Sequence, residues 1–441
     1  MDFYLVTLGC PKNEVDSEMM AQLLVEAGHQ PVDRPDEADL LIANTCGFIG
    51  DARQESYDVL QELANLKRPH QSLLAAGCLT QRDCDAVCRR VPEVDAVIGT
   101  RNWSEIISVV EGLEPQRKSV YRAIREQGDL IASVRRRTPR GQTAYIKIAD
   151  GCDAGCAFCA IPLIKGPQAS KPLDTILREA QELIEQGARE LVLIAQDTTA
   201  YGRDLGLTDG LPLLLRRLAE IAPEPSWIRI LYAYPQHISD NLIATMAVLP
   251  QVCHYLDLPL QHGHPDMLRR MRRPHDLAMV HDRITALRKA MPDIALRSTF
   301  IVGFPGETEQ EFEALLAFMQ EIAFDHVGVF SYSRERGTPA AEMPDRVPQR
   351  IIAERHQEAM LAQQTISHQR NREQIARVLP VLIEGVGEGL TVARSYRDAP
   401  EIDGMILIQG EHQQAGFVDV RIVGAQPYDL VGEIFSEADT T

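Results

Sequence analysis

The chain has 441 residues, of which 45% are hydrophobic, and this length exceeds that of one ordinary domain. Its formal net charge of -18 is opposite to the basic excess of most dedicated nucleic-acid binders, although it leaves room for a local basic patch. The sequence has neither a long apolar run nor a signal-peptide pattern, so we expect a cytoplasmic protein without membrane partners. Nine cysteines are too sparse for a disulfide scaffold, which leaves metal binding, catalysis or packing.

The first predicted domain, residues 1–113, alternates short apolar runs with stretches of helical periodicity. This alternation is typical of a doubly wound parallel sheet. The strand candidates are 3–8, 40–43, 73–76 and 96–98. Residues 114–137 are charged and lack this periodicity, so we interpret them as a linker.

The second predicted domain, residues 138–375, contains six strand candidates separated by helical stretches. Six strand–helix units are too many for a small open sheet and too few for a closed eightfold barrel, so they predict a partial (β/α)6 barrel. The candidates are 144–148, 191–195, 228–232, 255–258, 295–302 and 326–332. The last domain, residues 376–441, has short alternating strands that predict a small antiparallel β-barrel.

Three cysteines follow the first strand of the second domain in a Cys-x3-Cys-x2-Cys pattern: Cys152, Cys156 and Cys159. A cubane iron–sulfur cluster has four irons, which normally bind four thiolates. Three thiolates leave one iron open to chelate S-adenosylmethionine and to pass an electron to its sulfonium. The alternative is a set of structural thiols or part of a zinc site, but zinc needs four ligands and no matching pair follows.

Three more cysteines each follow a predicted strand of the first domain and stand next to a glycine: Cys10, Cys46 and Cys78. Because the carboxyl ends of parallel strands meet at one sheet edge, we expect these thiols to converge on a second three-thiolate site. Packing is the alternative, since cysteine is a common core residue. Cys84 and Cys88 compete as ligands from a predicted helix, although we favour packing for both. Cys253 has no partner pattern and is assigned to the core.

The stretch 151–159, with Phe158 before its third cysteine, resembles the signature of the radical S-adenosylmethionine superfamily. The strand-to-helix turn 303–308 agrees with this resemblance. Thr308 and Glu311 are expected to form a capping box at the start of the helix. Two three-cysteine sites followed by a small barrel resemble the methylthiotransferase branch of that superfamily over nearly the whole chain. Stretches 9–13 and 16–18 resemble the auxiliary-cluster domain of that branch. Three other stretches resemble its ribosomal-protein (RimO) family more than its transfer-RNA family: 196–202, 257–262 and 393–404.

The resemblance implies an auxiliary-cluster domain, a radical S-adenosylmethionine barrel and a C-terminal TRAM domain. It implies two [4Fe-4S] clusters, one on each cysteine set, and S-adenosyl-L-methionine as a further cofactor. The expected contacts to that cofactor are Phe158, Gln196, Gln261 and Arg297. The implied reaction adds a methylthio group to the β-carbon of an aspartate of ribosomal protein S twelve. One S-adenosylmethionine methylates a sulfur, and a second yields the radical that removes hydrogen from the carbon.

The implied partners are ribosomal protein S twelve or the small ribosomal subunit, a reductant such as flavodoxin or ferredoxin, and a sulfur donor. One alternative is methylthiolation of a transfer-RNA adenosine. The acidic last domain, with three arginines against eleven acidic residues from position 378, favours a basic protein substrate over phosphates. We expect Asp398, Glu401 and Asp403 to dock that substrate from an exposed loop. A second alternative, a non-catalytic iron–sulfur carrier, does not account for the open irons or the barrel.

Overall fold

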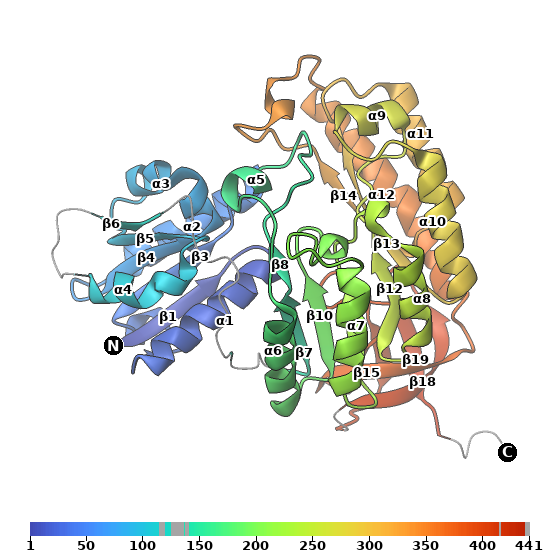
Figure 1. Cartoon of the computed structure of the whole chain (residues 1–441), viewed down its shortest axis with the longest axis horizontal. Coiled ribbons are helices and arrows are strands. Elements are labelled where there is room, and N and C mark those ends of the chain that lie inside the picture. The colour runs from blue at the N-terminus through green and yellow to red at the C-terminus, as the bar shows by residue number, and fades with distance from the viewer. Residues whose placement is uncertain (114–119, 125–135, 137–140, 414–415, 437–441) are drawn as a thin grey trace.

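The structure of the chain is a computed structural model that describes every residue except 114–119, 125–135, 137–140, 414–415 and 437–441. It contains an N-terminal parallel sheet, a central partial barrel and a C-terminal small barrel (Figure 1). The N-terminal domain lies beside the central barrel, and the small barrel lies beneath the central strands in this view. Among the described residues, each helix is too short or too polar to cross a lipid bilayer.

The N-terminal sheet has six parallel strands in the order β2-β1-β3-β4-β5-β6, with helices packed on both faces, which confirms the doubly wound arrangement. Strand β3 is apolar over its first four residues, which fits this position, because every residue of the strand is buried. Strand β6 falls within the predicted linker, most of which lies outside the described residues. The elements are β1 (Asp2–Thr7), α1 (Pro11–Glu26), β2 (Gln30–Pro31), β3 (Leu40–Thr45), α2 (Gly50–Leu66), β4 (Ser72–Gly77), α3 (Cys78–Arg90), β5 (Ala96–Gly99), α4 (Ile106–Glu111) and β6 (Tyr121–Ala123).

The central sheet also has six parallel strands, in the order β14-β13-β12-β11-β10-β7, and its helices pack on the outside. Strands β7 and β14 are its two edges, so the sheet is the partial barrel that the sequence predicts. Its strands are β7 (Thr143–Lys147), β10 (Glu190–Ile194), β11 (Trp227–Ile230), β12 (Val252–Asp257), β13 (Ala295–Val302) and β14 (His326–Ser331).

The connections of the central barrel are mostly helical, apart from a two-stranded ribbon of β8 and β9 beside the loop that carries Cys152, Cys156 and Cys159. The ribbon and helices are β8 (Ala149–Asp150), α5 (Ile161–Ile164), β9 (Ala169–Ser170), α6 (Leu173–Glu185), α7 (Gly210–Ile221), α8 (Asp240–Val248), α9 (Pro265–Arg270), α10 (Leu277–Ala290), α11 (Glu309–Ile322) and α12 (Gln349–Arg372). Helix α11 begins with the capping box of Thr308 and Glu311, which confirms that prediction.

The C-terminal domain is a closed barrel with the strand order β15-β16-β17-β19-β18. Four neighbouring pairs are antiparallel, whereas β17 and β19 are parallel. The predicted small antiparallel barrel is therefore confirmed, with one parallel pair, because strand directions cannot alternate all the way around a closed ring of five. The strands are β15 (Val378–Gly387), β16 (Leu390–Ser395), β17 (Ile406–Gln409), β18 (Phe417–Ala425) and β19 (Leu430–Ile434).

Candidate metal centres

The first cysteine set lies at the carboxyl ends of three neighbouring strands of the N-terminal sheet. Cys10 follows β1 and caps α1, Cys46 directly follows β3, and Cys78 follows β4 as the first residue of α3. Strands β1, β3 and β4 are adjacent in the sheet. The topology therefore brings all three thiols to one edge, as their places after strands suggest.

Two glycines let these three loops approach one another closely. A Cβ atom at Gly9 would lie 2.9 Å from the Cys46 sulfur, and Gly9 has a φ of +95°. A Cβ atom at Gly47 would lie 2.7 Å from the carbonyl of Cys78. Both distances are shorter than any real side chain tolerates, so glycine is required at both positions.

Asn13, in the first turn of α1, connects the loops that carry the three cysteines. Its amide nitrogen donates to the carbonyl of Leu8 at 2.9 Å and to the carbonyl of Thr45 at 3.1 Å. Its side-chain oxygen accepts from the Cys78 thiol at 3.5 Å. Asn13 is 1% exposed, and it holds the Cys10, Cys46 and Cys78 loops together.

The second cysteine set lies on the loop between β8 and α5. At the centre of this loop, the amide of Ala157 donates to the carbonyl of Met271 at 2.9 Å, and its carbonyl accepts from the amide of Ala340 at 2.8 Å. The guanidinium of Arg273 lies 3.8 Å from the Cys156 sulfur. Hydrogen bonds to two other segments of the barrel thus hold the loop in place, and the positive charge of Arg273 lies next to the Cys156 thiol.

The donor chemistry of both sets fits an iron–sulfur cluster. Burial raises the pKa of Cys78 and of Cys159 to about 12, and that of Cys152 to about 11. Bound iron would supply the positive charge that keeps such thiols deprotonated. The described residues contain no group of three His, Cys, Asp or Glu side chains spaced for a single metal ion. A cluster requires a wider spacing, since each thiolate binds a different iron.

Cys78 of the first set lies at the contact between the N-terminal domain and the central barrel. Cys78 packs against Ala160, the residue after Cys159, and against Ile164 of α5. Arg101 donates to the carbonyl of Ile164 at 2.8 Å from the N-terminal side of this contact. One cysteine of the first set thus touches the segment that carries the second set.

Three of the four expected S-adenosylmethionine contacts lie near this second loop or at carboxyl ends of barrel strands. Gln196 follows β10 and donates to Asp150 at 2.7 Å, while its own side-chain oxygen is buried without a partner. Gln261 follows β12 and is held by backbone hydrogen bonds to β13. Phe158 packs beside Phe304 in a small apolar cluster. The orphaned oxygen of Gln196 is the atom best suited to receive a donor from a cofactor.

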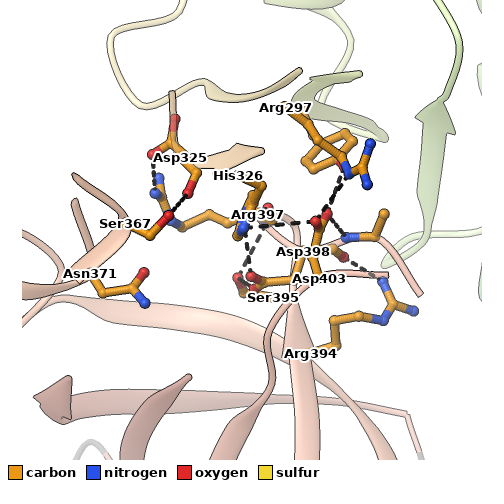
Figure 2. Close-up of polar contacts among 12 residues, drawn as sticks. Arg297, Asp325, His326, Ser367, Asn371, Arg394, Ser395, Arg397, Asp398 and Asp403 are labelled. Carbon is orange, nitrogen blue, oxygen red and sulfur yellow. Dashed lines mark hydrogen bonds and ion pairs between the residues drawn. The ribbon is translucent and has the colours of Figure 1, made fainter. Parts of the chain in front are cut away.

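Arg297 and the acidic loop of the last domain are placed differently from the prediction. Arg297 binds Asp257 and Asp403, each at 3.2 Å, and Figure 2 shows it directed toward the C-terminal domain. Its charge is therefore neutralised there, and we remove it from the expected cofactor contacts. Asp398 is 6% exposed and accepts from Ser395 at 2.7 Å. Of the three expected docking acids, only Glu401 is exposed, because the side chains of Asp398 and Asp403 are 9% and 2% exposed and lie against the barrel.

A cavity of about 270 Å³ borders the second cysteine loop at the carboxyl ends of β10 and β11. Asp153 and Ala154 of that loop line one side, and Asp197, Arg203 and His237 line the other. His237 lies 2.8 Å from Asp197 and 2.6 Å from Arg203. Barrel enzymes bind ligands at this end of their strands, so the cavity is a candidate for part of the cofactor site.

The sequence interpretation missed several residues around the centres. Lys12, on α1, donates to the carbonyl of Ala195 at 3.3 Å and lies 3.5 Å from the ring centre of Tyr232. Lys147 ends the apolar strand β7 and is 1% exposed. A lysine in an apolar strand requires a buried partner, and that signal was present in the sequence.

The remaining cysteines are as expected. Cys84 and Cys88 are half-buried on α3 and pack against one apolar core of the N-terminal domain. Cys253 is 3% exposed within another core. These contacts agree with a packing role, and the exclusion of Cys84 and Cys88 as cluster ligands stays a prediction.

Comparison with known families divides the chain as the structure does. Residues 2–99 match the uncharacterized protein family UPF0004, residues 146–319 match the radical SAM superfamily, and residues 375–435 match the TRAM domain. Among solved structures, the radical S-adenosylmethionine methyltransferase TsrM from Kitasatospora setae has a TM-score of 0.58 at 14% identity and covers 77% of this chain and 76% of its own. The cobalamin-dependent enzyme OxsB has a TM-score of 0.54 at 10% identity, with 83% of this chain and 56% of its own covered. These likenesses concern the fold alone.

Curated relatives match over nearly the full length. A protein of Roseiflexus sp. (strain RS-1) is 51% identical over 98% of this chain and 97% of its own, and one of Chloroflexus aurantiacus is 50% identical over 99% and 100%. A protein of Geobacter sulfurreducens is 44% identical over 98% of each chain. All three are named ribosomal protein uS12 methylthiotransferase RimO. Identity at this level over the whole chain shows that the protein belongs to the RimO family.

Proposed function

We propose that this chain is a radical S-adenosylmethionine methylthiotransferase that modifies the β-carbon of an aspartate of ribosomal protein uS12. Its cofactors are [4Fe-4S] clusters and S-adenosyl-L-methionine, as the radical SAM domain and the family imply. The observation that carries the proposal is the packing of Cys78, from the first cysteine set, against Ala160, the residue that follows Cys159 of the second set. We assign one cluster to Cys10, Cys46 and Cys78 and the other to Cys152, Cys156 and Cys159.

The reaction replaces one carbon–hydrogen bond by a carbon–sulfur bond. A first S-adenosylmethionine gives its methyl group to a sulfide and leaves as S-adenosylhomocysteine. A second accepts one electron and leaves as methionine and 5′-deoxyadenosine, which carries the substrate hydrogen atom. Coupling of the carbon radical with methylthiolate forms the new bond and returns one electron. An aspartate β-carbon has no readily acidic proton, which is why a radical route is needed.

The residues of this chain bind and orient the reactants. When bound, the clusters supply the electron for cofactor cleavage and a position for the sulfur. Arg273 places positive charge beside the thiolate of Cys156. Asp150 fixes the Gln196 amide so that its buried oxygen is free to accept a hydrogen bond from the cofactor. Asn13 holds the three loops of the auxiliary site together.

The enzyme also requires two partners, a reductant and a sulfur donor. The radical chemistry requires a low-potential reductant such as flavodoxin or ferredoxin, and each turnover consumes one sulfur atom from a donor. A ribosomal substrate supports the cytoplasmic location that is part of this proposal. We also propose that the chain divides into domains 1–113, 138–375 and 376–441, with residues 114–137 as the linker between the first two.

Mass spectrometry of ribosomal proteins and transfer RNA from cells with and without this chain tests the proposed function. We expect a methylthio group on uS12 that disappears without the chain and returns with the wild-type gene. A Cys152→Ala gene is the matched control, and it should not restore the modification. Loss of a transfer-RNA methylthio group with unchanged uS12 would overturn the substrate assignment.

A further inference from the structure

Four charged side chains are buried together where the N-terminal domain meets the central barrel: Asp16, Lys147, Asp150 and Lys165. Their exposed fractions are 2%, 1%, 0% and 2%. Asp16 comes from α1, Lys147 and Asp150 come from β7 and β8, and Lys165 directly follows α5. Two positive and two negative charges balance, and we call this group the charge quartet.

Each lysine of the quartet contacts both carboxylates. Lys165 lies 2.8 Å from Asp150 and 3.3 Å from Asp16. Lys147 lies 3.1 Å from Asp150 and also pairs with Asp16. Asp16 is the only member from the N-terminal domain, so its two ion pairs cross between the domains. Sliding α1 along the barrel would break both pairs in a place where water cannot replace them.

Each segment of the quartet is joined by a short stretch of chain to a cysteine of the two centres. Asp16 lies on the helix that Cys10 caps, and Asp150 stands two residues before Cys152. Lys165 ends the short helix that begins two residues after Cys159. A displacement at the quartet would therefore move one cysteine set relative to the other.

We propose that the charge quartet fixes the relative position of the two cluster sites, so that sulfur at one site lies within reach of the carbon radical made at the other. This inference rests on the proposed function, which assigns a cluster to each cysteine set. Apolar contacts permit small sliding movements, whereas alternating buried charges stabilise one register. The rate of radical coupling depends steeply on the distance between the reacting atoms. A misplacement of one of them by about 1 Å lowers the rate about 100-fold. The quartet members are positioning residues and touch no reacting atom.

The double variant Asp16→Asn/Lys165→Met tests this role in the full-length protein loaded with both clusters. It removes one charge of each sign, so Lys147 and Asp150 remain as a neutral pair. Iron content should still correspond to two clusters, and reductive cleavage of S-adenosylmethionine should continue. We expect methylthiolated product to fall about 100-fold relative to 5′-deoxyadenosine. The magnetic interaction between the two reduced clusters, measured by electron paramagnetic resonance, should also change.

Asp325→Asn/Arg397→Met is the matched control, since it removes a similarly buried pair where the C-terminal domain meets the barrel. It should leave the magnetic interaction and the product ratio as in the wild type. If the quartet double variant fails to fold, Asp16→Glu keeps the charge and lengthens the side chain by one methylene, and it should still shift the magnetic interaction. The proposal would be overturned if a quartet variant that binds both clusters showed the same magnetic interaction and the same product ratio as the wild type.

The magnetic measurement needs no protein substrate, so it separates this inference from the proposed function. A wild-type enzyme that does not methylthiolate uS12, but whose magnetic interaction depends on Asp16, would overturn the function and support the quartet. The opposite pattern, with uS12 modified normally by the double variant, would retain the function and overturn the quartet.

Discussion

The central barrel contacts a neighbouring domain at each end of its strands, and buried ion pairs lie at both contacts. The carboxyl ends contact the N-terminal domain, and the amino ends contact the C-terminal domain. At the carboxyl ends of its strands, the charge quartet and a second group of ion pairs, in which Arg53 and Arg82 bind Glu335, join it to the N-terminal domain. At the amino ends, Glu190 binds Arg229 at 2.7 Å and also pairs with Arg394 of the C-terminal domain. Of these two contacts, only the one at the carboxyl ends is formed by segments that also carry the cysteines of the two proposed centres.

The second contact explains why the last domain is not a free acidic module. Asp325 binds Arg397 at 2.6 Å, and His326 lies 3.5 Å from Asp398 (Figure 2). Asp325 also binds Arg370 at 3.1 Å. Burial alone would raise the pKa of Glu190, but Arg394 and Arg229 lower it to about 2, so this carboxylate is ionised at neutral pH. Several charges that suggested substrate docking therefore hold the domain in place.

The largest effect is expected at the radical centre. The triple variant Cys152→Ala/Cys156→Ala/Cys159→Ala should lose reductive cleavage of S-adenosylmethionine completely, because the radical centre would no longer hold the iron that binds the cofactor and delivers the electron. Iron content should fall from two clusters to one. Cleavage that persists, or iron content that falls to zero, would contradict the division into two centres.

The auxiliary centre should separate cleavage from sulfur insertion. The triple variant Cys10→Ala/Cys46→Ala/Cys78→Ala should still produce 5′-deoxyadenosine but no methylthiolated protein, since the sulfur site is lost. The measurement is the ratio of the two products. Cys84→Ala/Cys88→Ala is the control and should keep the auxiliary cluster, because these thiols pack on α3. Loss of that cluster in the control would show that our ligand assignment is wrong.

The contact at the amino ends should affect stability more than chemistry. Arg394→Met leaves Glu190 with one partner fewer in a buried site, and we expect the free energy of unfolding to fall by about 3–5 kcal/mol. Cofactor cleavage per folded molecule should stay unchanged. Arg372→Met, at the exposed end of α12, is the control and should cost less than about 0.5 kcal/mol. Chemical denaturation measures both, and equal losses would contradict the structural role of Arg394.

The smallest effect is expected from Glu401→Lys, the single exposed member of the three acids. A basic ribosomal protein should associate more slowly with this variant, on the order of threefold at low salt, and the difference should vanish as salt screens it. Stability should not change. Asp403→Lys should instead destabilise the protein, because Asp403 is buried against Arg297. Unchanged uS12 modification by Glu401→Lys at low salt would show that this loop plays no part in docking.

The fold and the cysteine sets were readable from the sequence because they depend on local patterns. Strand–helix alternation predicted both parallel sheets, and the spacing of Cys152, Cys156 and Cys159 predicted the loop at the end of β7 and β8. The place of Cys10, Cys46 and Cys78 after strands predicted their common sheet edge. Hydrophobic periodicity and turn chemistry act over a few residues, so a single sequence contains them.

The partners of the buried charges were decided only by the tertiary structure. Asp16 and Lys147 are 131 positions apart, and Arg297 and Asp403 are 106 positions apart. A charged side chain looks the same in a sequence whether it faces water, a cofactor or an ion-pair partner from another domain. The sequence by itself determined the domain order and the two cysteine sets. Domain packing decided that Arg297, Asp398 and Asp403 hold the last domain and that the charge quartet joins the two centres, because burial makes a charge depend on whatever lies beside it.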